Sequence, residues 1–337
     1  MMKAIGYTHS LGINEPNALV DIDIEKPSAS GRDLLVKISA IAVNPVDYKI
    51  RHRVNPNGGD PKILGWDAVG EIVDIGADVT EFAVGDRVYY AGDLTRAGSN
   101  AEFQLVDERI VGKMPESLTF SEAAALPLTA ITAWELLFDR LGLKNDSDSS
   151  DVILVTGAAG GVGSILTQLA KCLTKATVVG TASREESQSW VKLMGADYVV
   201  NHHQSLDAQL KECGVSTVTH VASLTHTDQH YKNIVELMAP QAKFALIDDP
   251  VELDIKVFKR KSISIHWEFM YTRSMFQTKD MSVQQVILNE VSRLIDAGVL
   301  KTTLTQHYGK INAENLTKAH QAIQTGRMLG KLVLEGF

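Results

Sequence analysis

The amino-acid sequence predicts an α/β protein with two domains, a partly closed β domain and a doubly wound parallel sheet. One observation is the stretch LVTGAAGGVGSILTQLAK (Leu154–Lys171), in which small residues join an apolar, β-branched run to an amphipathic run. The second is an alternation of strand and helix patterns over residues 128–266. The third is a series of short strands, separated by turn residues, before residue 125.

Residues 1–125 consist of short runs of alternating polarity divided by Gly, Pro and Asp turns. This pattern is typical of an antiparallel sheet with one face toward a core. The predicted strands of this part are Leu34–Ala42, Gly70–Ile75, Arg87–Tyr90 and Glu102–Leu105.

Residues 128–266 repeat an apolar strand followed by an amphipathic helix, which predicts parallel strands with crossover helices. Helices are predicted at Glu185–Met194 and at Gln229–Met238, where Pro240 stops the second one. DSDSSD (Asp146–Asp151) is a polar loop that leads into the first strand. The predicted strands are Val152–Ala158, Ala176–Ser183, Tyr198–Asn201, Val218–Ser223, Lys243–Ile247 and Ser262–His266.

The C-terminal part adds two helices, Val283–Ala297 and Ala313–Thr325, and a last strand, Lys331–Leu334. We assign this part to the first domain, so that the parallel-sheet domain is an insertion. The expected boundaries are therefore 1–127 for the β domain, 128–266 for the parallel sheet and 267–337 for the return to the β domain.

Composition excludes several classes of protein. The net charge of −8 argues against nucleic-acid binding, for which a basic stripe is expected. No apolar run approaches the roughly 20 residues of a membrane span, and the N-terminus lacks the apolar region of a signal peptide. Two cysteines, Cys172 and Cys213, supply neither a disulfide framework nor a zinc ribbon. We expect a cytoplasmic protein without membrane or nucleic-acid partners.

The glycine-rich turn resembles the dinucleotide-binding pattern G-x-G-x-x-G, with Ala158, Gly160 and Gly163 at its three glycine positions. The first amides of the following helix and its positive dipole end would bind a phosphate. Ala158 departs from the pattern, and the alternative is a glycine-lined turn of another α/β protein.

Four segments of the chain, in this order, resemble the medium-chain dehydrogenase/reductase superfamily, and the resemblance covers essentially the whole sequence. Within it, the chain is most similar to the quinone-oxidoreductase-like branch and to a bacterial group called zinc-type alcohol dehydrogenase-like. The resemblance implies a GroES-like β domain and a Rossmann domain. The segments are AVNPVDYKIR (Ala42–Arg51), GWDAVGEIVDIGADVTEFAVGDRV (Gly65–Val88), LPLTAITAWELL (Leu126–Leu137) and GAAGGVGSILTQLAK (Gly157–Lys171).

Zinc enzymes of this superfamily hold catalytic zinc at three places that fall on Asn44, Trp66 and Pro127 here, none of which is a good zinc ligand. No cysteine lies in Asp93–Lys113, where relatives bind structural zinc. HTDQH (His226–His230) is a weak alternative metal site, because Thr227 stands where a general-base Glu is needed. We expect no metal.

The cofactor expected is NADPH. In NAD enzymes an acid at the end of the second strand binds the ribose, and here that place is Ala182, followed by Ser183 and Arg184. A hydroxyl and a guanidinium suit a 2′-phosphate. His202 matches a place where relatives approach that phosphate. The alternative is that Arg184 is solvated and Glu185 binds the ribose.

The resemblance also implies functional residues. We expect catalytic or substrate-positioning roles for Asn44, Tyr48 and Trp66, with Asp47 either catalytic or capping a turn and Tyr48 either a hydroxyl donor or a pocket wall. Arg327 and Lys331 are either cofactor contacts or a solvated pair of charges. The full set of expected cofactor-binding residues is Thr129, Ala158, Gly160, Gly161, Val162, Gly163, Ser183, Arg184, His202, Leu224, Arg327 and Lys331.

These observations favour a zinc-independent, NADPH-dependent reductase of quinones or α,β-unsaturated carbonyls. The alternatives are a zinc-type alcohol dehydrogenase of small alcohols and aldehydes, and a non-catalytic NADPH-binding protein. We also expect a homodimer joined through Ser262–Trp267, because this last strand of the parallel sheet falls at an edge and relatives pair it across a two-fold axis. The alternative is that helices of the C-terminal part cover this edge.

Overall fold

A computed structural model describes residues 1–56, 60–144 and 150–337 of the chain. Within these ranges the chain forms two compact units: Met1–Ile131 with Tyr271–Phe337, and Thr132–Met270. The sequence placed the divisions at 127/128 and 266/267. Residues 146–149 of the predicted polar loop lie outside the described residues. Among the helices that the structure describes, none is long and apolar enough to cross a membrane.

The strand pairs of the first unit are antiparallel, as the alternating polarity of its sequence predicts, except for β15 and β16, which are parallel. Its strands are β1 (Met2–Tyr7), β2 (Val20–Ile24), β3 (Asp33–Ala42), β4 (Lys62–Ile63), β5 (Ala68–Ile75), β6 (Arg87–Tyr90), β7 (Phe103–Asp107), β8 (Val111–Lys113), β15 (Leu304–His307) and β16 (Lys331–Glu335). Its helices are α1 (Pro45–Arg53), α2 (Phe120–Ala124), α9 (Thr272–Met275), α10 (Val283–Asp296) and α11 (Ala313–Gln324). Helix α3 (Pro127–Trp134) crosses into the second unit.

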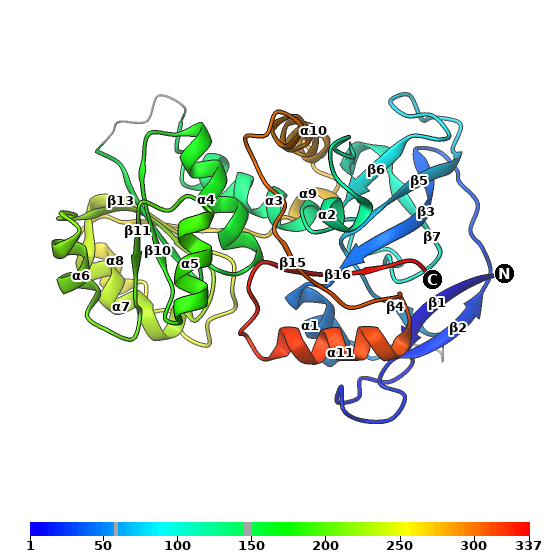
Figure 1. Cartoon of the computed structure of the whole chain (residues 1–337), viewed down its shortest axis with the longest axis horizontal. Helices are drawn as coiled ribbons and strands as arrows, with labels where there is room; N and C mark the ends of the chain where they lie inside the picture. The colour runs from blue at the N-terminus through cyan, green and yellow to red at the C-terminus, as the bar shows by residue number, and fades with distance from the viewer. Residues whose placement is uncertain (57–59, 145–149) are drawn as a thin grey trace. The chain divides into compact units, whose positions relative to one another are not determined.

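In the larger sheet of this unit, β3 from the N-terminal part of the chain pairs with β16, the last strand. The strand order of this sheet is β15-β16-β3-β5-β6-β8, and β7 also pairs with β3. Strand β16 lies antiparallel to β3, with Val333 opposite Ala42 (Figure 1). This pairing brings Lys331, at the start of β16, close to the residues that follow β3.

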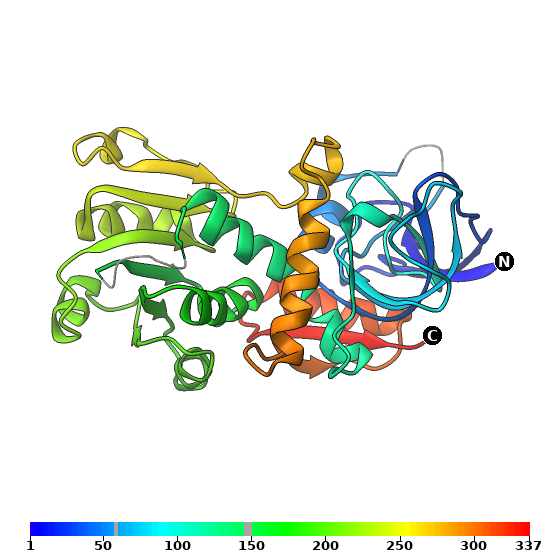
Figure 2. The same cartoon turned by 90° about the horizontal axis from the view of Figure 1, so that it is seen from above.

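The second unit contains a parallel sheet in the order β11-β10-β9-β12-β13-β14. This is the doubly wound order, and it places β14 at one edge, as predicted (Figure 2). The strands are β9 (Val152–Thr156), β10 (Thr177–Thr181), β11 (Tyr198–Val200), β12 (Val218–Ser223), β13 (Met238–Leu246) and β14 (Ser264–Trp267). The helices are α4 (Gly161–Leu173), α5 (Glu185–Leu193), α6 (Leu206–Glu212), α7 (Thr227–Leu237) and α8 (Lys256–Lys259), and a π-helix spans Glu135–Arg140.

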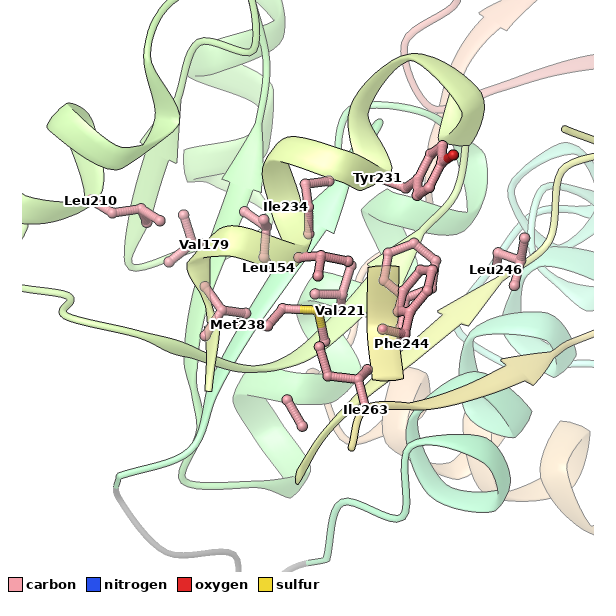
Figure 3. Close-up of a cluster of buried hydrophobic side chains, with 14 of the residues drawn as sticks. Leu154, Val179, Leu210, Val221, Tyr231, Ile234, Met238, Phe244, Leu246 and Ile263 are labelled. Carbon is pink, nitrogen blue, oxygen red and sulfur yellow. The ribbon is translucent and has the colours of Figure 1, made fainter. Parts of the chain in front are cut away.

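A buried apolar cluster fastens helices α6 to α8 to one face of this sheet. Ile234 of α7 lies beside Leu154 of β9, and Tyr231 of the same helix lies near Phe244 of β13 (Figure 3). Each of these side chains is removed from water, which contributes roughly 1.5–3 kcal/mol for a large apolar residue. The cluster therefore fixes the strand ends from which the site loops begin.

Several predicted boundaries differ from the structure. Strand β14 begins at Ser264 rather than at Ser262, since Ser262 has a φ of 52°, which is left-handed rather than extended. Helix α7 ends at Leu237, before Pro240, and the chain passes directly into β13 at Met238. Proline disfavours helical geometry in the residue before it, so the helix ends earlier than the proline itself. Strand β9 ends at Thr156, because Gly157 takes a φ of 62° and begins the turn.

Candidate active site

The turn after β9 has the geometry of a phosphate-binding loop. Gly157 has a φ of 62°, a left-handed conformation that favours glycine. The amide of Gly160 donates to the Gly157 carbonyl at 3.1 Å, and α4 begins at Gly161. The first amides of a helix have no carbonyl one turn earlier to bond, so those of Gly161, Val162 and Gly163 are suited to an anion.

Gly163 allows α4 to pack closely on this turn. A Cβ at this position would lie 2.6 Å from both the Cα and the carbonyl oxygen of Ala158. The expected cofactor residues Ala158 and Gly160–Gly163 therefore meet at one helix terminus. Gly157, which was not singled out in the sequence, makes the tight turn that Ala158 was expected to make. The arrangement fits the pyrophosphate of a dinucleotide.

The loops after β9 and β12 lie side by side. The amide of Leu224 donates to the Thr156 hydroxyl at 2.9 Å. A Cβ at Gly157 would meet the Thr225 side chain at 2.8 Å. Strands β9 and β12 are neighbours where the strand order reverses, and dinucleotides bind at such switch points. This places Leu224 beside the glycine turn.

The end of β10 carries no acid at the position where NAD enzymes have one. That position is Ala182, which is buried, and it is followed by a half-buried Ser183 and an exposed Arg184. In the parallel pairing of β10 and β11, Thr181 lies opposite Val200. Ser183 and His202, two residues beyond that pair, thus leave the sheet at the same edge. Glu185 is exposed in the first turn of α5.

A buried polar network in the first unit brings Asn44, Asp67 and Lys331 together. The Lys331 ammonium donates to Asn44 Oδ1, to Asp67 Oδ2 at 2.9 Å and to the Val43 carbonyl at 3.3 Å. The Asn44 amide nitrogen donates to Asp67 Oδ2 at 2.8 Å. These bonds hold the Asn44 amide in place. Of the two roles expected for Lys331, a solvated charge is wrong because the side chain is buried, and a cofactor contact stays a prediction.

The start of helix α1 positions Asn44. Pro45 is the first helical residue, and the Asn44 amide donates to Asp47 Oδ2 at 2.6 Å. This bond is one half of a capping box, in which the third helical residue reaches back to the N-cap. Asp47 therefore fixes the turn, which was one of its two expected roles.

Burial raises the pKa of both carboxyl groups near Asn44, those of Asp67 and Asp47. Asp67 accepts from Asn44, Lys331 and the amide of Leu128 and donates to none of them, which is the pattern of a carboxylate. Burial raises the pKa of Asp67, and the ammonium of Lys331 and these hydrogen bonds oppose the rise. Burial raises the pKa of Asp47 to about 7, although the hydrogen bond from the Asn44 amide and the positive charge of Lys331 lower it.

The remaining expected site residues occupy different environments in the first unit. Tyr48 is half-buried on α1, with its ring edge-on to His52 at 6.4 Å between centroids. Trp66 is buried, and its indole N–H donates to the Asp93 carbonyl at 3.2 Å. The Thr129 hydroxyl donates to the Leu126 carbonyl at 3.0 Å. Arg327 is exposed.

One residue of the network, Asp67, and one buried residue affected by its charge, Tyr271, were not identified from the sequence. Asp67 follows Trp66 in an otherwise apolar run, and an acid in such a run signals a buried partner. Tyr271 is buried, and both burial and the charges of Asp47 and Asp67 raise its pKa. Tyr271 lies more than 200 positions away from these aspartates, and no local pattern links them.

The residues at the three zinc-ligand places do not suit zinc. Asn44 is engaged by Lys331 and Asp67, the Trp66 indole N–H is a donor, and Pro127 begins α3. Among the described residues, no group of three or more His, Cys, Asp and Glu side chains is arranged to hold a metal ion. A buried ammonium at Asn44 also opposes a divalent cation electrostatically.

Two family models match the chain. The model for the alcohol dehydrogenase GroES-like domain matches residues 30–128, and the model for zinc-binding dehydrogenases matches residues 194–334. A zinc-type alcohol dehydrogenase-like protein of Staphylococcus aureus is 39% identical over 99% of both chains. A 2-methylene-furan-3-one reductase of Solanum lycopersicum is 28% identical over 99% of this chain and 79% of its own length.

Solved structures agree with this assignment. A protein of Rhizobium etli, described as a proposed zinc-dependent alcohol dehydrogenase, is 51% identical, with a TM-score of 0.97 over 100% of this chain and 98% of its own. A quinone oxidoreductase of Pseudomonas syringae and a mycobacterial protein complexed with NADPH are each 25% identical, with TM-scores of 0.83 over 99% of this chain and 100% of theirs. The chain therefore belongs to the medium-chain dehydrogenase/reductase superfamily of oxidoreductases, in the zinc-type alcohol dehydrogenase-like group.

Proposed function

We propose that the chain is a zinc-independent reductase that uses NADPH to reduce quinones or α,β-unsaturated carbonyls. The observation that carries the proposal is the binding of Asn44 by the Lys331 ammonium and the Asp67 carboxylate at a place where zinc relatives have a ligand. An asparagine held in this way, with a cation beside it, is a poor metal ligand. The residues at the other two places, Trp66 and Pro127, add none.

The absence of zinc ligands restricts the acceptor. Zinc in alcohol dehydrogenases polarises the reacting oxygen as a Lewis acid, and a simple ketone loses this strong assistance when no zinc is bound. Quinones and enones spread the incoming charge over a phenolate or an enolate, so hydrogen bonds and positioning are sufficient. When bound, NADPH supplies the hydride. Tyr48 is the proposed hydroxyl donor to the developing oxyanion, and Trp66 forms part of the substrate pocket.

The cofactor preference rests on the end of β10. Because Ala182 stands where NAD enzymes have an acid, no carboxylate repels a phosphate on the 2′ oxygen of the cofactor's adenosine ribose. Ser183 and Arg184 offer that phosphate a hydroxyl and a guanidinium. We expect NADPH to bind at least about tenfold tighter than NADH, a preference of about 1.4 kcal/mol. Arg184→Ala should lose most of this preference, with Arg293→Ala on α10 as the control. Loss of NADH affinity with NADPH affinity intact would contradict the assignment.

Activity is tested by NADPH oxidation against quinones, enones, aldehydes and ketones, on protein whose zinc content is measured in the same sample. We expect turnover with quinones or enones at a zinc content far below one atom per chain. Turnover restricted to alcohols or aldehydes and abolished by a chelator would favour the alcohol dehydrogenase alternative. NADPH binding without turnover of any compound would favour the non-catalytic alternative.

We also propose that the chain forms a homodimer in which β14 pairs with its own copy. Strand β14 pairs only with β13 in the described sheet, so its outer edge has free backbone groups. Trp267, at the end of this strand, is 57% exposed, which is a large apolar surface for a lone protomer. A two-fold axis through this edge would cover both features.

A further inference from the structure

Four of the ten histidines of the chain lie close together in the second unit. His202 and His203 follow β11, and His226 and His230 lie at the start of α7. The ring centroids of His202 and His203 are 4.4 Å apart, and those of His202 and His230 are 5.7 Å apart. We call these four residues the histidine cluster.

Two rings of the cluster, those of His202 and His230, disfavour positive charge. Burial lowers the pKa of His202, and the neighbouring His203, His230 and His226 lower it further. Burial likewise lowers the pKa of His230, with His226 and His203 adding to the effect and Asp228 opposing it. His202 Nδ1 is buried without a hydrogen-bond partner among the described residues. His202 and His230 therefore disfavour the charged form unless an anion lies close to them.

The register of the sheet places the cluster next to the proposed 2′-phosphate residues. Thr181 of β10 lies opposite Val200 of β11, so Ser183 and His202 emerge as neighbours at the carboxyl ends of two parallel strands. His230 reaches the same place from α7, since its ring lies edge-on to that of His202. Asp248 accepts from the amide and the hydroxyl of Thr227 at the start of α7.

We propose that the histidine cluster is a proton-linked phosphate site, which takes up a proton when the 2′-phosphate of the cofactor binds. This inference rests on the proposed use of NADPH. A phosphate monoester has a second pKa near 6 and is therefore mostly a dianion above pH 6.5. A dianion close to the imidazoles favours their charged form, and the charged form in turn binds the dianion more tightly. Cofactors without the 2′-phosphate do not take part in this coupling.

The test compares NADP⁺ and NAD⁺, which are stable in mild acid, in buffers containing EDTA. Dissociation constants are measured by titration calorimetry between about pH 8.5 and pH 6.5, in pairs of buffers with different ionisation enthalpies. We expect the ratio of the NAD⁺ to the NADP⁺ dissociation constant to rise about fivefold or more as the pH falls. NADP⁺ binding, but not NAD⁺ binding, should take up protons.

Variants assign the effect to the cluster. His202→Gln combined with His230→Gln should flatten the pH dependence and remove the proton uptake. His9→Gln, an exposed histidine of the first unit, should retain both. Unchanged affinity for NAD⁺ in the double variant shows that its fold is intact. If the double variant does not fold, His202→Gln and His230→Gln are measured singly, and each should reduce the proton uptake; uptake unchanged in both overturns the role of the cluster.

The two proposals fail in different ways. A preference for NADP⁺ that is independent of pH and free of proton uptake overturns the role of the cluster but leaves the cofactor assignment standing. Equal affinity for NADP⁺ and NAD⁺ throughout the pH range overturns both. Proton uptake that persists in the double variant assigns the coupling to other groups and also overturns the role of the cluster.

Discussion

Replacement of Lys331 by Met should destabilise the first unit far more than the loss of an ordinary ion pair. The Lys331 side chain is 4% exposed, and its ammonium lies 2.9 Å from the carboxylate of Asp67, which is fully buried. Methionine matches the length of the lysine stem but leaves the Asp67 carboxylate without its counter-ion. It also leaves Asn44 Oδ1 without the Lys331 donor.

The structure contains a matched control. Lys318 and Glu314 form an ion pair of 2.6 Å on helix α11, which is shorter than the buried pair, with Lys318 54% exposed. Water and salt screen this pair, so Lys318→Met should change the free energy of unfolding little. Removal of one partner of a buried pair costs about 3–5 kcal/mol, because the other charge stays buried and unpaired. Burial, rather than distance, thus decides the magnitude for Lys331→Met.

Urea unfolding gives the free energy, and hydrogen exchange of peptides from β3 and β16 locates the loss in the first unit. Asp67→Asn in the Lys331→Met background should recover part of the stability, because the unpaired charge is then removed. A loss for Lys331→Met no larger than that for Lys318→Met would refute the account of the network. A further loss in the double variant would refute it too.

Three further predictions concern other parts of the chain. Burial raises the pKa of Asp47 from 3.8 to about 7, so the free energy of unfolding of the wild type should fall as the pH rises from 4 to 7. Asp47→Asn should remove up to about 4 kcal/mol of this change with pH, as measured by urea unfolding at each pH. Gly163→Ala places a Cβ 2.6 Å from Ala158 and should cost about 1–3 kcal/mol while weakening NADP⁺ binding, seen as a lower melting temperature and a higher dissociation constant. Light scattering should show a wild-type dimer and a Trp267→Glu monomer, with Val251→Glu, 95% exposed in the wild type, still dimeric; a monomeric wild type would contradict the proposed interface.

The parts of the fold that could be predicted from sequence are those with a strong local pattern. Strand β12 and strand β6 have the predicted bounds, since each is a short apolar run between turn residues. The doubly wound order follows from the alternation of strand and helix. Strands β1, β2, β4, β8 and β15 were not predicted; β4 and β8 have only two and three residues, too few for a periodic pattern, and β2 was overlooked although VDIDI alternates as a strand does.

The candidate site likewise has one part that could be predicted from sequence and one part that could not. The glycine turn is visible in sequence because its parts are contiguous, although the positive φ falls on Gly157 rather than on Ala158. The buried network is not visible, because Lys331 reaches Asn44 and Asp67 only through the pairing of β16 with β3. A lysine at the start of a strand looks like a solvated charge until that pairing is known.

The proposed reaction is tested most directly by transfer of deuterium from NADPH labelled at C4 of the nicotinamide. The protein is first shown by elemental analysis to hold far less than one zinc per chain, and it is then mixed with an α,β-unsaturated ketone. The account predicts that the label appears on the β-carbon of the saturated ketone, at a rate unchanged by EDTA. Label on the carbonyl carbon of an alcohol product, formed only when zinc is restored, would contradict it.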